Sequence, residues 1–99
     1  MCGIIGISSN KSVSANIINS LKKLEYRGYD SAGIATLSNG EIKEVKSEGR
    51  VNSLEQNFDL KNLNGSIGIG NVRWADHGAP TKLNAHLHSS ENVSVVHNG

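Results

Sequence analysis

The hydrophobic positions change their spacing along the chain, and each change marks a predicted element. The run "GIIGIS" behind Cys2 is short and continuously apolar, which predicts a buried strand. Apolar residues then recur every three or four positions, which predicts a helix with Ser12 as its N-cap and Gly28 just past its end. Its apolar face comprises Val13, Ile17, Ile18, Leu21 and Leu24. We expect this face to pack on a sheet.

The middle of the chain has the pattern of a hairpin. "SAGIATL" (31–37) and "EIKEVKS" (41–47) read as strands, and "SNGE" joins them, because Asn-Gly supplies the positive φ angles of a type I′ turn. "VNSLEQNF" has a weak helical pattern, with Leu54 and Phe58 four positions apart. The polar stretch "DLKNLNG" that follows predicts a loop.

The last third contains two apolar runs around a long irregular segment. "SIGIGNVRW" predicts a buried strand and "NVSVV" a second strand. Between them, "ADHGAPTKLNAHLHSS" has the only proline and little periodicity, so we expect a loop, a frequent place for function. The sequence stops at Asn-Gly, which normally leads into another strand. We therefore interpret residues 1–99 as part of a larger domain.

Composition and charge remove several classes of function. The 99 residues are 36% hydrophobic, or about 47% with the 11 glycines, which is in the globular range, and 19% charged, which is somewhat low. Ten Lys and Arg against nine Asp and Glu leave a charge of +1 with no basic run. Neither a nucleic acid nor a membrane surface is therefore expected as a partner. The chain has no apolar run near the roughly 20 residues of a membrane span, and no signal-peptide pattern. With one cysteine and no internal disulfide, we expect a cytoplasmic protein.

The single cysteine stands directly behind the initiator methionine. Removal of Met1 would leave Cys2 with a thiol and a free α-amine on one residue. Both groups ordinarily titrate within about two pH units of neutrality, so the amine can accept the thiol proton, directly or through a water. One residue then supplies nucleophile and base, as in N-terminal nucleophile enzymes. Taken alone, Cys2 also fits simple packing in a buried strand.

A nucleophile also needs an oxyanion stabiliser and a grip on its substrate. The side-chain amide of Asn98 and the backbone N–H of Gly99 are candidates for the first, although Asn-Gly is equally an ordinary turn. Arg73, at a strand end, suits bidentate capture of a carboxylate, and its alternative is a surface ion pair. Trp74 is either a loop anchor or core.

The histidines open a different reading. His86 and His88 lie two positions apart, so an extended strand would turn both toward one face. Together with His77, His97, Asp76 or Cys2 they could form a transition-metal site. The spacing is generic and no zinc signature is present, so hydrogen bonding in a glycine-rich loop is the preferred role of these histidines.

Four motifs together resemble a known family. "MCGIIG", "LEYRGYDSAGIA" (24–35), "RWADHGAPTKLNAHLH" (73–88) and "VVHNG" occur in the order and spacing of the glutaminase domain of class II glutamine amidotransferases, and they span essentially the whole chain. Within this family, "EYRGYDSAG" together with "NAH" and the following His88 most resembles the branch that transfers ammonia to fructose 6-phosphate. The branch that uses a phosphoribosyl acceptor is the alternative, and a non-catalytic relative of the fold is a third reading.

The resemblance implies an α+β fold, the α/β/β/α four-layer sandwich of N-terminal nucleophile hydrolases, of which residues 1–99 would form the N-terminal part. It implies hydrolysis of glutamine without metal or organic cofactor, and transfer of ammonia to a C-terminal sugar isomerase domain, absent from this chain, in a homo-oligomeric parent. By position, Cys2 resembles the nucleophile, and Asn98 and Gly99 the oxyanion hole. The residues that resemble the substrate site are Arg73, which clamps the glutamine α-carboxylate, Trp74, Asp76 and His77 in the substrate loop, the conformationally sensitive His86, and Arg27 and Gly28, which line the cavity.

Two positions depart from the family pattern. Asp76 stands where the family usually has Thr. A carboxylate about 4 Å from the substrate carboxylate would weaken binding by on the order of 4 kcal/mol at an effective dielectric near 20 if nothing compensates. The alternatives are that Asp76 turns away or binds the substrate ammonium. Leu87 replaces a common Pro, which removes no chemical group.

The resemblance also places further strands, and an acidic residue that binds the glutamine ammonium, beyond Gly99. We therefore expect unpaired edges at "SIGIG" and "SVV", and poor stability and no activity for the isolated 99 residues.

Overall fold

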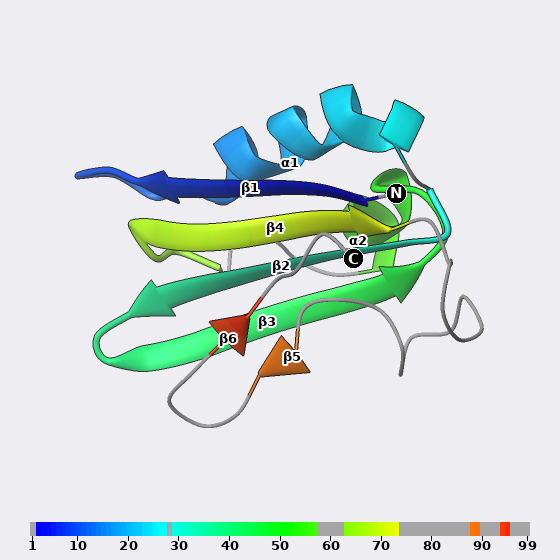
Figure 1. The fold of residues 1–99 in the computed structure, drawn as a ribbon. Helices are drawn as coiled ribbons and strands as arrows, with labels where there is room; N and C mark the ends of the chain where they lie inside the picture. The colour runs from blue at the N-terminus through cyan, green and yellow to red at the C-terminus, as the bar shows by residue number, and fades with distance from the viewer. Residues whose placement is uncertain (1, 28, 58–62, 74–87, 90–93, 96–99) are drawn as a thin grey trace.

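The computed structural model describes residues 2–27, 29–57, 63–73, 88–89 and 94–95. Its centre is an antiparallel sheet of four strands with helix α1 (Ser14–Leu24) on one face (Figure 1). Across the sheet the strands follow the order β1 (Cys2–Ser8), β4 (Ile67–Arg73), β2 (Ser31–Ser38) and β3 (Glu41–Glu48). This arrangement belongs to the predicted α+β class.

Helix α1 buries the predicted apolar face against the sheet. Val13, Ile17 and Leu21 are fully buried, and Ile18 and the partly buried Leu24 pack with them. The predicted N-cap is wrong: the helix is preceded by Val13 and has no side-chain cap, because the Ser12 hydroxyl donates to the Leu63 carbonyl at 3.4 Å. A tertiary hydrogen bond has replaced the local one.

The helix does not run on to Gly28. After Leu24 the chain tightens into a 3-10 turn, η1 (Glu25–Arg27), and Gly28 lies outside the described residues. Within the described part of the chain, no helix has the length and apolar character to cross a membrane.

The hairpin and the short helix are confirmed. β2 and β3 pair along their whole length, and the turn between them has positive φ angles at Asn39 (53°) and Gly40 (76°), as a type I′ turn requires. The weak pattern after β3 forms α2 (Asn52–Asn57), which buries Leu54. Phe58 lies outside the described residues.

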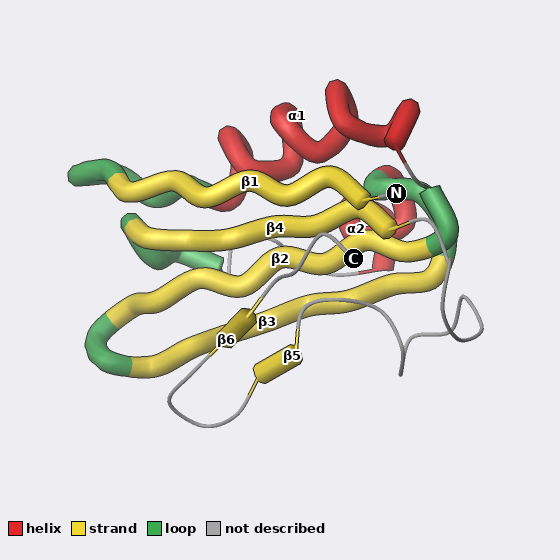
Figure 2. The backbone as a smooth tube through the Cα atoms, in the orientation of Figure 1, coloured by secondary structure: helices red, strands yellow, loops and turns green. Residues whose placement is uncertain are grey.

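Strand β4 is an inner strand, so the expected free edge at "SIGIG" is wrong. It pairs with β1 on one side and with β2 on the other, as Figure 2 shows. Both pairings bring together segments distant in sequence, which local periodicity does not report. The edges of the sheet are β1 and β3.

Two short strands, β5 (His88–Ser89) and β6 (Ser94–Val95), pair with each other. The strand predicted in "NVSVV" is confirmed for Ser94 and Val95, and its other residues lie outside the described part. The predicted irregular segment is wrong at its last described residues, because His88 and Ser89 are extended and paired. Pairing of β6 with β5 also contradicts a fully unpaired edge at "SVV".

The two faces of the sheet differ in character. Alternation places the buried Val72 and Ile34 on the face that α1 covers. The opposite face carries Asn71 and Arg73 toward the start of β1. Nearer the hairpin turn it carries exposed apolar side chains at Ile67 and Leu37, and Ile4 on β1 is exposed on the same face.

Candidate active site

The pairing of β1 with β4 sets Cys2 directly opposite Arg73. Directly opposed residues of antiparallel strands have Cα atoms about 4.5–5.5 Å apart and share a face of the sheet. Arg73 is 5% exposed, so it is held by the fold and is not a loose surface cation. Two candidates separated by most of the chain thus become neighbours.

The end of β4 is also tied to the start of β2. Ser31 is the partner of Arg73 across this pair, and the backbone carbonyl of Arg73 accepts a hydrogen bond from the Asp30 N–H at 2.8 Å. The Asp30 carbonyl in turn accepts from the Gly49 N–H at 2.8 Å. Three segments therefore meet at the Cys2 end of the sheet: the end of β4, the turn before β2 and the chain after β3.

Two polar residues at this end escaped the sequence reading. Ser31 and Asn71 are fully buried, and the Ser31 hydroxyl and both polar atoms of the Asn71 side chain have no hydrogen-bond partner in the described structure. An unpaired buried polar group costs about 1–3 kcal/mol, which marks positions where a function can outweigh stability. The signal was present: Asn71 interrupts an apolar strand two residues before Arg73, on the same face.

A cluster of side chains holds the η1 turn beside this end. The Glu25 carboxylate accepts hydrogen bonds from the Arg50 guanidinium, at 2.9 Å, and from the Val51 backbone N–H, at 3.2 Å. The Arg50 guanidinium also lies over the Tyr29 ring, 4.5 Å from its centroid. Glu25 and Arg50 are 25 positions apart, so no local sequence pattern marks them as a pair.

Of the ten predicted site residues, the structure brings Cys2 and Arg73 together. Arg27 belongs to η1, which contacts both β1 and β4, so its backbone lies near the same end of the sheet. The other seven lie outside the described residues: Gly28, Trp74, Asp76, His77, His86, Asn98 and Gly99. Most of the alternative histidine cluster lies there too, since only His88 of the four histidines is in a described strand.

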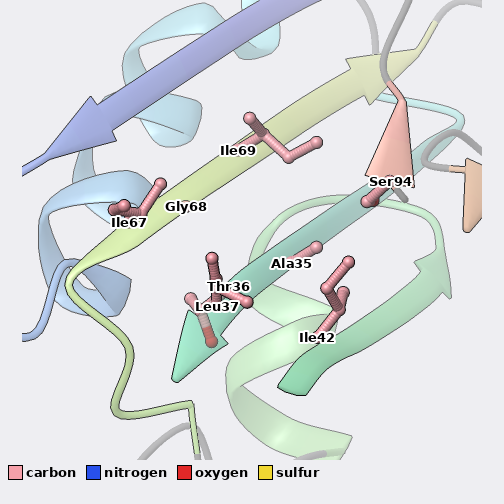
Figure 3. Close-up of a pocket in the computed structure, with 8 residues that line it drawn as sticks. All are labelled: Ala35, Thr36, Leu37, Ile42, Ile67, Gly68, Ile69 and Ser94. Atoms are coloured by element: carbon pink, nitrogen blue, oxygen red, sulfur yellow. The ribbon is translucent and has the colours of Figure 1, made fainter. Parts of the chain in front are cut away.

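An apolar pocket of about 180 Å³ lies elsewhere on the sheet (Figure 3). It is lined by parts of β2, β3, β4 and β6: Ala35, Thr36, Leu37, Ile42, Ile67, Gly68, Ile69 and Ser94. Ile69 precedes Arg73 by four positions on β4, a distance of about 13 Å along a strand. None of the predicted site residues lines this pocket, so it is distinct from the candidate active site.

Comparison with known proteins finds relatives that match the whole chain. No protein-family model matches the chain. Proteins from Mesorhizobium japonicum and Rhizobium meliloti, both named glutamine–fructose-6-phosphate aminotransferase [isomerizing], are 50% and 52% identical to it over all 99 residues. Over its whole length the chain is therefore similar to one part of proteins of this name. It spans 16% of the length of these relatives.

A solved structure is similar to the chain at the level of the fold. The glutamine phosphoribosylpyrophosphate amidotransferase from B. subtilis superposes with a TM-score of 0.77 and 26% identity, over 95% of this chain and 20% of that one. This neighbour is an N-terminal nucleophile hydrolase of the glutamine amidotransferase group, so the predicted fold class is confirmed. The described residues contain helix α1 on the four-stranded sheet and the separate two-stranded sheet of β5 and β6.

Proposed function

We propose that this chain is part of a glutaminase that hydrolyses glutamine to glutamate and ammonia, with Cys2 as the nucleophile. The observation that carries the proposal is the register that sets Cys2 opposite the buried Arg73. A carboxylate held by Arg73 would bring the other end of a small amino acid to Cys2. The names of the relatives support glutamine as that amino acid and fructose 6-phosphate as the acceptor of ammonia.

In this mechanism the residues of the chain take successive roles. Arg73 binds the α-carboxylate as a bidentate donor, and the segment with Trp74, Asp76 and His77 encloses the substrate. The α-amine of processed Cys2 accepts the thiol proton, and the thiolate attacks the side-chain amide carbonyl. The C–N bond breaks, ammonia leaves with the proton held by the amine, and a thioester remains. Water attacks the thioester and releases glutamate and the thiol.

Stabilisation of the tetrahedral intermediates falls to the end of the chain. The side-chain amide of Asn98 and the backbone N–H of Gly99 are the proposed donors to the oxyanion. Arg27 and Gly28 form a wall of the cavity, and His86 responds to the state of the site. Every step uses protein groups and water, so the proposal requires neither a metal nor an organic cofactor.

The larger assembly is also part of the proposal. We infer that residues 1–99 belong to a larger glutaminase domain, since Ile4, Leu37 and Ile67 leave an exposed apolar face opposite α1 and the relatives are much longer. In the parent protein a sugar isomerase domain receives the ammonia and converts fructose 6-phosphate to glucosamine 6-phosphate. We propose that the parent protein is a homo-oligomer in the cytoplasm; the single cysteine agrees with a reducing compartment.

The test uses the full reading frame that encodes this chain. The protein is incubated with a glutamine analogue that carries an electrophilic ketone in place of the amide, and is then analysed by intact mass and peptide mapping. We expect loss of Met1, one label on Cys2, and protection by glutamine. Cys2→Ala is the matched control for labelling at other nucleophiles. A retained Met1 with unlabelled Cys2 would refute the proposal.

A second candidate function has support from the fold comparison. The B. subtilis structure belongs to an amidotransferase named for phosphoribosylpyrophosphate, so a glutaminase that serves a different acceptor is compatible with the same fold. Stimulation of glutamine hydrolysis separates the two, because fructose 6-phosphate should stimulate the first enzyme and phosphoribosylpyrophosphate the second. A non-catalytic relative, for which Asp76 is the main argument, would show neither stimulation nor labelling.

A further inference from the structure

The turn between η1 and β2 is held from two sides by the backbone. On one side the Asp30 N–H donates to the carbonyl of Arg73 at 2.8 Å. On the other side the Gly49 N–H donates to the carbonyl of Asp30 at the same distance. Gly49 has a φ of 87°, in the left-handed region that favours glycine, and this lets the chain after β3 turn back toward Asp30. The position of Asp30 therefore depends on Gly49 as well as on β4.

The side chain of Arg50 closes the same turn from outside. Its guanidinium donates to the Glu25 carboxylate, which is 16% exposed, and covers the ring of Tyr29. Glu25 begins the segment 25–30 and Tyr29 lies near its end, so one planar cation contacts both parts of this segment. Residues 26–28 lie between these two anchors, and they include Arg27 and Gly28.

Stability alone does not account for this arrangement. The Arg50 side chain is 61% exposed, and an exposed ion pair or an exposed cation–π contact contributes little to folding. The effect of a contact on the position of catalytic groups can be much larger than its effect on stability, because a shift of about 1 Å in a group that orients a substrate can lower a rate about a hundredfold. A clamp with a small effect on stability can thus have a large effect on a site.

We propose that Arg50 is a positioning residue of the glutamine site. Together with Glu25 and Tyr29 it holds the turn at residues 25–30 against the Arg73 end of β4, and so sets the distance between the cavity wall at Arg27 and Gly28 and the nucleophile Cys2. This inference rests on the proposed glutaminase function and extends it to a residue that contacts neither substrate nor nucleophile.

The experiment compares two reagents on the full-length protein. The electrophilic glutamine analogue reports on Cys2 in a formed glutamine site, whereas iodoacetamide alkylates an accessible thiol without needing that site. The variants are Arg50→Ala and Arg50→Lys. Lys22→Ala is the matched control, because it removes another exposed ion pair, with Glu55, on the α1 and α2 side of the molecule.

We expect Arg50→Ala to lower the rate constant for the glutamine analogue by about tenfold or more, with iodoacetamide alkylation changed by less than about twofold. Arg50→Lys keeps a cation facing Glu25 but loses the planar contact with Tyr29, so its rate with the analogue should fall by about threefold. Lys22→Ala should react like the unaltered protein with both reagents.

The inference is overturned if Arg50→Ala and Lys22→Ala react equally fast with the analogue. A parallel fall with both reagents would also overturn it, since that pattern reports general loss of structure. If the unaltered protein reacts with iodoacetamide but not with the analogue, the proposed function itself fails. That result is distinct from one in which the unaltered protein is labelled and Arg50 has no influence.

Discussion

Gly70, in the middle of β4, lies directly beneath helix α1. A Cβ added there would stand 2.6 Å from Ile17 Cγ2, 3.1 Å from Leu21 Cδ1 and 3.2 Å from Ile5 Cγ2. Carbon atoms in protein cores pack about 3.5–4.0 Å apart. The substitution Gly70→Ala therefore requires α1 to move away from the sheet by about 1 Å, or three core side chains to leave their preferred rotamers.

The expected loss follows from two opposing effects. Overpacking a core costs about 1–3 kcal/mol, while replacing Gly by Ala lowers the entropy of the unfolded chain and returns about 0.4–1 kcal/mol. Gly70→Ala should therefore destabilise the fold by about 1–2 kcal/mol. Gly6→Ala on β1 is the matched control, because its nearest new contacts are at 3.9 Å, an ordinary packing distance. We expect that change to be neutral or slightly stabilising.

Hydrogen exchange of the β4 amides in the full-length protein measures both variants without requiring the domain to be isolated. Gly70→Ala should increase exchange of these amides by about 5- to 30-fold, and Gly6→Ala should not. In an Ile17→Ala background the added methyl meets less resistance, so Gly70→Ala should cost about 1 kcal/mol less there. Equal exchange in Gly70→Ala and Gly6→Ala would refute the idea that close helix–sheet contact requires glycine at position 70.

Three further predictions concern single side chains. Thr36 is 2% exposed, and its hydroxyl has no hydrogen-bond partner in the described structure. In thermal unfolding, Thr36→Val should therefore be neutral or stabilise the protein by up to about 1 kcal/mol. A loss of stability above about 1 kcal/mol would show that the hydroxyl has a partner. Arg73→Lys loses bidentate binding, so the KM for glutamine in the steady-state glutaminase assay should rise about 10- to 100-fold, and an unchanged KM would remove Arg73 from the carboxylate site. Asp76→Thr removes a repulsion of on the order of 4 kcal/mol at most, so the KM for glutamine should fall by up to about a thousandfold. An unchanged KM would show that Asp76 points away from the substrate.

Much of the local structure was predictable from the sequence. The spacing of Val13, Ile17 and Leu21 identified the buried face of α1, and Asn39 with Gly40 identified the hairpin turn. These features depend on residues a few positions apart, so they leave a periodic signal in the chain. The position of Cys2 and the chemistry of its thiol and amine are likewise properties of the sequence alone.

Other features were decided by the tertiary structure. The insertion of β4 between β1 and β2 pairs Cys2 with Arg73 and makes "SIGIG" an inner strand, against the prediction from sequence. The Ser12 hydroxyl donates to the Leu63 carbonyl and does not cap the helix. Glu25 binds Arg50, which is 25 positions away in the sequence. Such choices follow from burying the apolar face of α1 against a continuous sheet, a gain that no segment achieves alone. Local propensity therefore selected the helices and strands, and burial of surface selected their neighbours.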